Sequence, residues 1–348
     1  MPTIIHMTKL SLPIAVIILN WNGRKLLAEF LPSVVEHLPG DIARLIVADN
    51  GSTDDSVAWL RENYPEVEVM ELAENYGFAE GYNRAIATVA DEYRYTILLN
   101  SDVAVDSDWI TPLYRFMQSH PKAVAVQPKI LSYRDRTVFE YAGAAGGFLD
   151  RNGYPYCRGR LFAVVEADRG QYDEPMRVMW ASGAALMVDN KAYLLAGGLD
   201  SSFFAHMEEI DLCWRMQLRG GEVWCCPASH VYHLGGGSLP AENPRKTYLN
   251  FRNNLLMLHK NLPAGVRVRR LIRRRLLDTL AFMKYALTLD FRNAAAVWRA
   301  HRDYARMRSD IATSDATIDL TAGCPDILTE YYLKRHTTFS SLSKRSEC

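Results

Sequence analysis

The sequence lacks any hydrophobic run long enough to cross a membrane, since no stretch of about 18 uncharged apolar residues occurs. Its first residues, Met1 to Lys9, also lack the basic start, apolar stretch and small-residue cleavage site of a secretory signal. We therefore expect no transmembrane span and no secretion, and we predict a cytoplasmic protein.

The common glycine motifs for phosphates and the common cysteine motifs for metals are also missing. There is no GxGxxG after the first predicted strand and no GxxxxGK[ST] anywhere, which disfavours a dinucleotide site or a P-loop. The six cysteines form no CxxC pair, so reduced thiols are the simplest interpretation. A nucleotide bound here would have to be held by carboxylates and a metal rather than by a glycine-rich loop.

The charge is unevenly distributed along the 348 residues, although the net charge is zero. Residues 244–308 contain 16 basic and 3 acidic side chains, a net charge of +13. The other residues contain 24 basic and 37 acidic side chains, a net charge of −13. The chain therefore joins two electrostatically different regions, and both need a functional explanation.

Strands and helices alternate over the first 130 residues. Apolar runs predict strands at 13–19, 44–48, 67–72, 95–99 and 123–130, and helical periodicity fills the intervals between them. This alternation predicts an α/β fold with a mostly parallel sheet and helices on both faces. Later we expect hairpins or a long excursion at 131–172, a strand at 176–188, a helix at 210–219, short strands at 222–226 and 231–234, and helices from 245 onward, with a break at 262–265.

Polar residues follow three of the predicted strands, at the sheet edge where open parallel sheets bind ligands. Asp49 can accept hydrogen bonds from a ribose or a base, although it can also merely cap a turn. The segment Asn100-Ser101-Asp102 places a carboxylate at the tip of a buried strand. Such a carboxylate is a ligand for Mg²⁺ or Mn²⁺, which take their remaining ligands from water and phosphate.

A second group of acids begins the helix near residue 208. Glu208, Glu209 and Asp211 could simply favour the helix dipole, and Asp211 could pair with Arg215 one turn later. That explanation suits Asp211 better than the two glutamates, because burying charge beside large apolar residues is costly without a use. His233 precedes three glycines; it is either a packed side chain or a metal or diphosphate contact.

Taken in order, these landmarks resemble the inverting glycosyltransferases of family 2, which have the GT-A fold, and in particular the bacterial branch that includes rhamnosyltransferases. The resemblance covers about residues 12–260. It rests on seven segments: IILNWNG (17–23), VADNGSTDDS (47–56), ENYGFAEGYNRAI (74–86), LLNSDV (98–103), WASGAALMV (180–188), FFAHMEEIDLCWR (203–215) and HVYHLGGGS (230–238).

The resemblance implies a site residue by residue. The nucleoside contacts would be Asn20 and Asp49, and the border of the donor pocket would be formed by Asn75, Gly81 and Asn83. Asn100, Ser101 and Asp102 match the DxD-type motif, in which Asp102 holds a divalent cation and His233 completes the metal or diphosphate site. The sugar and acceptor region would be lined by Trp180, Ser182 and Gly183. Glu209 matches the catalytic base, with Glu208 and Asp211 as alternatives.

The resemblance further implies a metal-dependent transfer of a sugar from a nucleoside-diphosphate sugar to a hydroxyl of a lipid-linked or polymeric cell-surface glycan. Rhamnose from a dTDP donor follows by resemblance only. A catalytically inactive nucleotide-sugar-binding or membrane-adaptor protein is the alternative. A nucleotidyltransferase would need a glycine-rich loop after the first strand, and Asn20-Trp21-Asn22-Gly23 is a poor one.

The basic region is predicted to form amphipathic helices. Between 266 and 277 arginines flank an apolar stripe, a combination that suits peripheral contact with an anionic inner membrane. Packing on the catalytic domain is the second interpretation, and nucleic acid is disfavoured because aromatic residues are not interleaved. We thus predict a catalytic GT-A domain (1–243), basic helices near the acceptor or membrane (244–312), and a partly disordered tail (313–348).

Overall fold

The structure is a computed structural model, and it describes residues 12–235 and 243–342. Its main sheet has the order β11-β13-β6-β12-β4-β1-β2-β3, with the short β5 paired to β13. The strands are β1 (Ile14–Asn20), β2 (Ala43–Asp49), β3 (Glu68–Glu71), β4 (Tyr95–Leu99), β5 (Val103–Ala104), β6 (Ala123–Ser132), β11 (Met176–Arg177), β12 (Ala185–Asp189) and β13 (Glu222–His233).

Most neighbouring strands of this sheet run parallel, as the sequence predicts. β1 pairs in parallel with β2 and β4, β2 with β3, and β13 with β6. The exceptions are β5, β11 and β12, which run antiparallel to their neighbours. The predicted α/β architecture with a mostly parallel sheet is confirmed.

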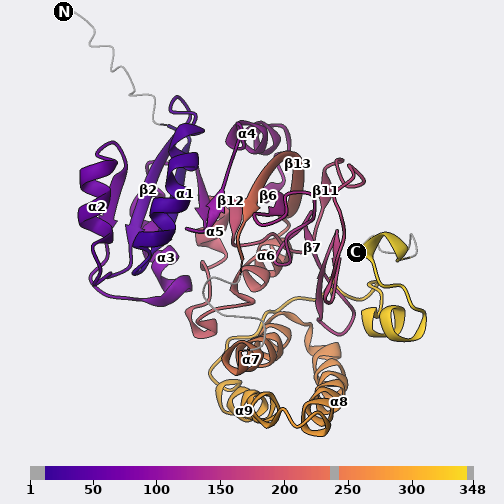
Figure 1. Cartoon of the computed structure of the whole chain (residues 1–348). Helices are drawn as coiled ribbons and strands as arrows, with labels where there is room; N and C mark the ends of the chain where they lie inside the picture. Colours follow the sequence, from indigo (N-terminus) through magenta and orange to yellow (C-terminus); the bar gives the residue numbers. More distant parts are fainter. Residues whose placement is uncertain (1–11, 236–242, 343–348) are drawn as a thin grey trace, which may run out of the picture.

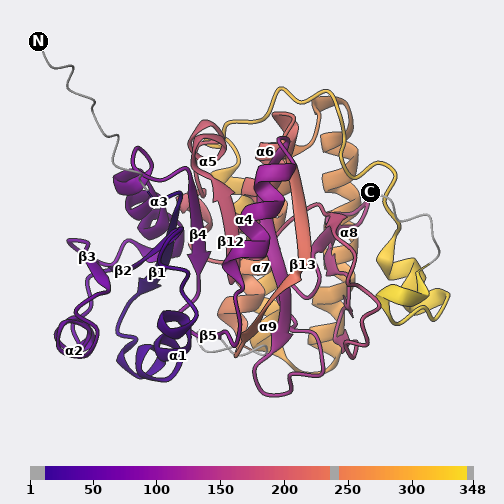
Figure 2. The same ribbon diagram turned by 90° about the horizontal axis from the view of Figure 1, so that it is seen from above.

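Helices cover both faces of the sheet, which explains why its strands are apolar on both sides. On one face, Ile14 and Val16 of β1 join the apolar residues of α1 (Arg24–Glu36), α2 (Ser56–Asn63) and α4 (Ile110–Ser119) in one buried cluster. On the other face, Ala15 and Ile17 join α3 (Gly77–Val89) and α6 (Glu208–Leu218). Figure 2 shows the helices on the two sides of the strands, and α5 (Asn190–Leu195) follows β12.

Two sequence-based boundaries differ from the structure. The run at 176–188 forms two strands, β11 and β12, because Trp180 turns aside to pair with Gly147 of the neighbouring hairpin. The predicted strands at 222–226 and 231–234 are one strand, β13, with a pairing irregularity between Cys226 and His230. As expected, hairpins fill part of the excursion: β7 (Gly147–Leu149), β8 (Pro155–Cys157), β9 (Arg160–Leu161) and β10 (Val164–Val165) form a separate antiparallel sheet.

Three helices follow the sheet and form a layer beside it (Figure 1). They are α7 (Pro244–Asn261), α8 (Ala264–Leu287) and α9 (Phe291–Met307), and α7 contacts α6 of the sheet region. Leu255 and Leu258 of α7 are fully buried in the same hydrophobic cluster as the α3 face of the sheet. The helices therefore share a core with the catalytic region, and the division at residues 243 and 312 stays a prediction.

The residues after α9 pack against both the hairpin sheet and helix α8. Ile327 is fully buried, and the Phe339 ring stacks on Phe148 of the hairpin sheet. Ion pairs join Arg270 to Asp319 and Arg273 to Asp326. Residues 313–342 are thus packed on the protein, and residues 343–348 of the tail that we predicted to be partly disordered lie outside the described residues.

The cysteines and the long helices bear on two further expectations. Cys157, Cys213, Cys225 and Cys226 are buried free thiols, whereas Cys324 is disulfide-bonded, so the expectation of reduced thiols is wrong for Cys324.

Within 12–235 and 243–342, every helix is too short or too polar to span a bilayer.

Candidate active site

The pairing of β5 with the end of β13 brings together two residues that are far apart in the sequence. His233 pairs with Val103 in this ladder, so its side chain meets Asp102, the residue just before β5. The His233 Nε2 and Asp102 Oδ1 atoms are 3.1 Å apart, and both side chains are buried. Asn100 Nδ2 lies 3.4 Å from the same imidazole nitrogen. The structure therefore places the predicted Asn100, Asp102 and His233 in one cluster.

His233 lies between two carboxylates. Its Nδ1 atom is 3.5 Å from Glu140 Oε2, on the side opposite Asp102. Burial by itself lowers the pKa of His233, but the hydrogen bonds and charges of Asp102 and Glu140 outweigh burial and raise this pKa to about 10. Glu140 was missed by the sequence reasoning, because it lies in the irregular 131–172 segment without a recognisable pattern.

The donor set of this cluster fits a divalent cation only in part. Because the raised pKa keeps a proton on His233, a cation would have to displace the proton from Nε2. The Asp102 oxygen and this nitrogen, 3.1 Å apart, could then bind one ion together, with phosphate and water supplying the remaining ligands. Among the described residues, no group of three or more His, Cys, Asp or Glu side chains is arranged to hold a metal. The protein therefore offers two ligands, Asp102 and His233, and a bound diphosphate would have to supply others.

Asn20 and Asp49 lie at the same sheet edge, where the ends of β1 and β2 are in register. Asn20 Nδ2 donates to Asp49 Oδ1 at 2.9 Å, and the backbone N–H of Ser52 donates to Asp49 Oδ2 at 2.9 Å. Asp49 therefore does cap the turn at Ser52, as the second interpretation of the sequence suggested. The Asn20 Oδ1 atom is buried and has no partner among the described residues, so this edge keeps an unused acceptor.

Asn75 and Gly81 lie next to this edge, and a third residue, Asn50, connects them to it. Asn50 Nδ2 donates to Asn75 Oδ1 at 3.1 Å, and a Cβ atom on Gly81 would lie 3.1 Å from the same nitrogen. The sequence reasoning did not select Asn50. Its position in the turn after Asp49 is the signal that could have identified it.

A backbone loop with unusual dihedral angles precedes the acidic helix. Phe204, His206 and Met207 have φ angles of 65°, 69° and 75°, a region that non-glycine residues rarely adopt. Strain of this kind is kept where the surrounding structure enforces it, often at functional sites. Glu208 and Glu209 follow directly, in the first turn of α6.

The two glutamates differ in their surroundings. Both have a buried Oε2 atom without a hydrogen-bond partner in the described part of the chain. Burial raises the pKa of both, and the charge of Glu209 raises the pKa of Glu208 further, to well above its usual value. Burial therefore disfavours the ionised form of both carboxyls, and the neighbouring charge disfavours it further for Glu208.

The sequence reasoning also missed His206 of the strained loop and Lys246 of α7, which lie close enough for their charges to interact. Burial lowers the pKa of His206 to about 4, and the charge of Lys246 contributes in the same direction. Lys246 lies in the first turn of α7, and its pKa is lowered by burial although Glu140 favours its charged form. The neutral His206 and the charged Lys246 thus lie at the junction between the strained loop and α7.

Asn253 of α7 holds the strained loop in place. It is fully buried, and its Nδ2 atom donates to the carbonyl oxygens of Phe203, Ala205 and His206 at 2.9, 2.8 and 2.7 Å. Arg252 Nη2 donates to Phe203 O as well, at 2.9 Å, and its Nε atom donates to Asn253 Oδ1. We refer to Arg252 and Asn253 as the loop clamp. The polar pair Asn253-Asn254 before an apolar run was its only sequence signal.

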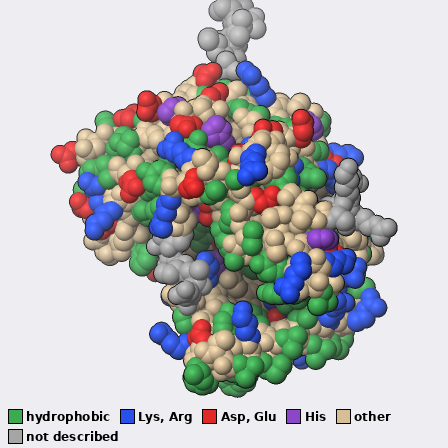
Figure 3. Space-filling model, turned by 45° about the vertical axis from the view of Figure 1, so that its right-hand side comes forward, with side chains coloured by type: hydrophobic (Ala, Val, Ile, Leu, Met, Phe, Trp, Pro, Cys, Tyr) green, Lys and Arg blue, Asp and Glu red, His purple; other side chains and the backbone are tan. Residues whose placement is uncertain are grey.

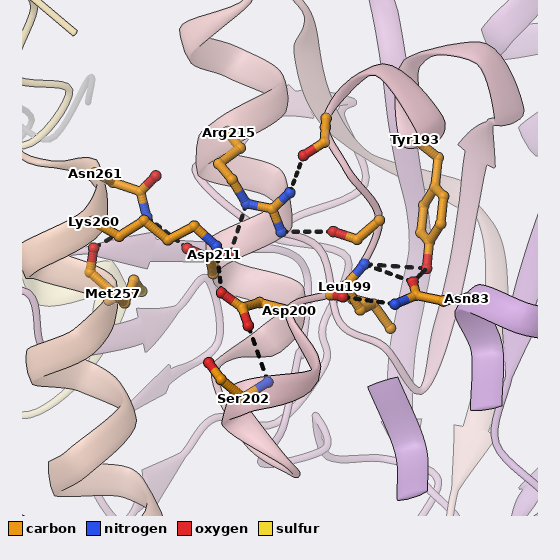
Figure 4. A network of polar contacts seen from close by, with 12 residues as sticks. Asn83, Tyr193, Leu199, Asp200, Ser202, Asp211, Arg215, Met257, Lys260 and Asn261 are labelled. Atoms are coloured by element: carbon orange, nitrogen blue, oxygen red, sulfur yellow. Dashed lines mark hydrogen bonds and ion pairs between the residues drawn. The ribbon is translucent and has the colours of Figure 1, made fainter. Parts of the chain in front are cut away.

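Asp211 belongs to a salt-bridge network that joins α6 to α7 (Figure 4). It is fully buried, and it accepts hydrogen bonds from Arg215 at 2.7 Å, Lys260 at 3.0 Å and Asn261 at 2.7 Å. The pairing with Arg215 that the sequence offered as an alternative is present. Because both carboxylate oxygens are occupied, we assign Asp211 a structural role and do not propose it as a base.

Three other predicted site residues form hydrogen bonds within the protein that stabilise the fold. Asn83 accepts from Tyr193 and donates to Leu199, also in Figure 4. Trp180 is buried against Gly147 and donates to Phe148 O, and Ser182 donates to Ala142 O. Their polar groups are satisfied within the protein, so the structure gives no support for direct substrate contact by these three side chains.

Gly183, which the sequence predicts in the sugar and acceptor region, lies beside Glu209. A Cβ atom at Gly183 would lie 3.8 Å from Glu209 Cβ and 3.5 Å from the Phe78 ring. The next residue, Ala184, accepts from the backbone N–H of Asn100. Two adjacent residues before β12 therefore contact the two halves of the site: Gly183 lies beside Glu209, and Ala184 binds the backbone of Asn100.

Comparison with known proteins identifies the family. Residues 15–168 match the model of glycosyl transferase family 2. These residues form a family 2 glycosyltransferase domain. Two rhamnosyltransferases among its relatives, described next, confirm the predicted resemblance to the rhamnosyltransferase-like branch.

Several relatives of this glycosyltransferase have named activities. It is 24% identical to the low-salt glycan biosynthesis hexosyltransferase Agl10 of Haloferax volcanii, over 70% of this chain and 74% of that protein. It is 29% identical to the N-acetylglucosaminyl-diphospho-decaprenol L-rhamnosyltransferase of Mycobacterium tuberculosis, over 54% of this chain and 66% of that protein. The rhamnosyltransferase WbbL of Escherichia coli is 25% identical over 45% of this chain and 61% of its own length.

Solved structures with the same fold include GalNAc-T7 in complex with UDP, GalNAc and Mn²⁺. It has a TM-score of 0.55 and 16% identity and covers 72% of this glycosyltransferase, which spans 48% of the GalNAc-T7 chain. Residues 1–349 of Staphylococcus aureus TarS have a TM-score of 0.50 and 13% identity, covering 74% of this chain and 69% of that one. At these identities the similarity shows the fold alone.

Proposed function

We propose that this glycosyltransferase transfers a sugar, with inversion, from a nucleoside-diphosphate sugar to a hydroxyl of a lipid-linked or polymeric cell-surface glycan. The observation that carries the proposal is the pair of glutamates with unpartnered buried oxygens, Glu208 and Glu209, connected through Gly183 to the cluster of Asp102 and His233. The names of the rhamnosyltransferase relatives support a deoxyhexose donor such as dTDP-rhamnose and a polyprenyl-diphosphate-linked acceptor.

In the proposed reaction, the Glu209 carboxylate removes the proton from the acceptor hydroxyl. The acceptor oxygen forms a bond to the anomeric carbon while the bond from that carbon to the donor diphosphate breaks, and the electron pair leaves with the diphosphate. The neighbouring charge raises the pKa of Glu208 beyond the effect of burial, so Glu209 is the glutamate that we propose as the base. His206 is neutral at physiological pH and adds no positive charge beside the base.

The donor side would be bound by the edge of the sheet. Asn20 and Asp49 are the proposed nucleoside contacts, and Asn75 and Gly81 border the same pocket. Asp102 and His233 would hold a Mg²⁺ or Mn²⁺ ion, which when bound neutralises charge on the diphosphate. The Mn²⁺ in the GalNAc-T7 structure supports this choice of ion. The cytoplasmic face of an anionic inner membrane remains the proposed location.

The test is the release of nucleoside diphosphate from a panel of nucleotide sugars, with and without Mn²⁺, in the presence of acceptor. Glu209→Gln is expected to lower turnover by about 10²–10⁴-fold, because it removes the base, and to leave donor binding intact. Glu92→Gln, at the opposite end of β4, is the matched control and should behave like the unmodified protein.

Two outcomes would contradict the proposal. If one donor binds but none is turned over, the chain is a nucleotide-sugar-binding protein instead. Asp102→Asn should weaken Mn²⁺-dependent donor binding; an unchanged donor affinity in this variant would refute the metal assignment.

A further inference from the structure

The outer face of α8 carries an apolar stripe that no part of the described chain covers. Large hydrophobic side chains recur every three or four positions along the helix, and their exposed fractions lie between 44% and 83%. The stripe consists of Val268, Ile272, Leu276, Leu280, Met283 and Leu287. At 100° per residue these positions fall within about 120° of the helix circumference.

The opposite face of α8 is the one that packs on the protein. Leu271, Arg274 and Asp278 are its buried residues. Arg274 and Asp278 form an ion pair at 2.7 Å, which His301 of α9 joins at 3.0 Å. The orientation of α8 is therefore fixed by a buried polar network, and the apolar stripe is left facing outward as a consequence.

The stripe continues beyond the end of α8. Leu289 and Phe291 in the following turn are 73% and 63% exposed, and Trp298 on α9 is 58% exposed. Nine of the seventeen large exposed hydrophobic side chains in the described residues thus lie within 268–298. An apolar surface gathered in this way marks an interaction site, whereas scattered exposed residues need no explanation.

Basic side chains lie at the margins of the stripe. Arg269, Lys284, Arg292 and Arg299 are exposed, and none of them forms an ion pair with a described residue. Arg270 and Arg273 of α8 are instead used in internal ion pairs. Figure 3 shows Lys and Arg side chains beside hydrophobic ones on the lobe formed by the C-terminal helices.

We infer that this surface docks the enzyme on an anionic lipid bilayer, with α8 lying in the plane of the membrane. The stripe is about 29 Å long at 1.5 Å per residue, and a long apolar face with basic margins is what interfacial helices present to anionic headgroups. A second copy of the chain fits less well, because its own basic margins would meet those of the first and repel them.

Docking through α8 and α9 leaves α7 on the side of the catalytic region (Figure 1). The loop clamp on α7 then connects the membrane-facing layer to the loop before Glu208. A lipid-linked acceptor in the same bilayer would present its sugar toward this loop; that last step rests on the proposed function, whereas the docking surface does not.

The test measures co-sedimentation of the full-length protein with vesicles, without any substrate. Binding is expected to vesicles of phosphatidylcholine with phosphatidylglycerol and not to phosphatidylcholine alone, and salt should weaken it. The double variant Leu276→Ser/Leu280→Ser should lower binding roughly 10-fold by removing apolar area. Arg269→Gln/Lys284→Gln should lower binding by about 5-fold per charge. The matched control, Leu194→Ser/Leu195→Ser, changes two similarly exposed leucines on α5 and should bind normally.

The results separate this inference from the proposed function. Nucleoside diphosphate release with a soluble acceptor should be the same in the stripe variant and the unmodified protein. Docking is refuted if the unmodified protein ignores anionic vesicles, or if the stripe variant binds them as well as the control. It is also refuted if the stripe variant converts a dimer to a monomer, because a second copy would then cover this face. Loss of transfer with intact vesicle binding would refute only the proposed function.

Discussion

The strongest test of the active-site assignment is the substitution Asn253→Ala in the loop clamp. The change removes three hydrogen bonds to the carbonyl oxygens of Phe203, Ala205 and His206. The amide has two N–H groups for these three oxygens, so at about 1 kcal/mol for each N–H it contributes about 2 kcal/mol. The backbone that this amide restrains costs about 1–3 kcal/mol at each of its three left-handed non-glycine residues. The strain of the three residues together is about 3–9 kcal/mol, and without Asn253 the remaining contacts of the loop would have to offset all of it, so we expect the loop to relax.

Relaxation of the loop would move the first turn of α6, and with it Glu208 and Glu209. A base displaced by about 1 Å loses roughly 100-fold in rate. We therefore expect Asn253→Ala to lower kcat about 100-fold, while the dissociation constant of the donor changes less than about 3-fold, because Asn20 and Asp49 lie on other elements. The assay is steady-state transfer together with donor titration.

The matched control is Asn254→Ala, one residue further along α7. Asn254 is also buried, but its amide donates to Gly153 of the hairpin sheet and not to the loop. Both variants should lower the melting temperature, and only Asn253→Ala should separate kcat from donor affinity. Equal loss of activity in the two variants, or a kcat within about 3-fold of normal in Asn253→Ala, would refute the positioning role.

Two further predictions concern Asp211 and His206. Asp211→Asn leaves the buried Arg215 and Lys260 without the negative charge of Asp211, so the free energy of unfolding in urea titrations should fall by about 3 kcal/mol. Turnover below the melting temperature should stay within about 3-fold of normal. A loss of about 100-fold would mean that Asp211 is the base. His206 has a folded-state pKa of about 4, below its value of about 6.5 in an unfolded chain. The unfolded chain therefore binds more protons as the pH falls, and stability should decrease by about 2 kcal/mol between pH 6.5 and 4. His206→Gln should flatten this part of the stability profile, and an unchanged profile would show that His206 is not buried in neutral form.

The sequence by itself determined strands β1 to β4 and β6, the helices between them and the sheet edge that carries the proposed site. Runs such as Ile14–Ile18 are apolar at every position, so they require a sheet covered on both faces. Asn20, Asp49 and Asp102 follow such runs directly, and parallel strands bring their carboxyl ends to one edge whatever the remaining fold. The acidic start of α6 was also readable, including the pairing of Asp211 with Arg215, because both lie one helical turn apart.

The tertiary structure decided which polar side chains remain available for chemistry. The sequence selects Asn83, Trp180, Ser182 and Asp211 as readily as Glu209, but their hydrogen bonds come from residues distant in the chain. The same holds for the loop clamp, since no local pattern says that Asn253 meets three carbonyl groups near residue 205. Hydrogen bonds between distant segments depend on how the elements pack, whereas periodicity reports only local structure. Likewise, the arginines and leucines of α8 define an amphipathic helix, but only the buried Arg274–Asp278 pair determines which face turns outward.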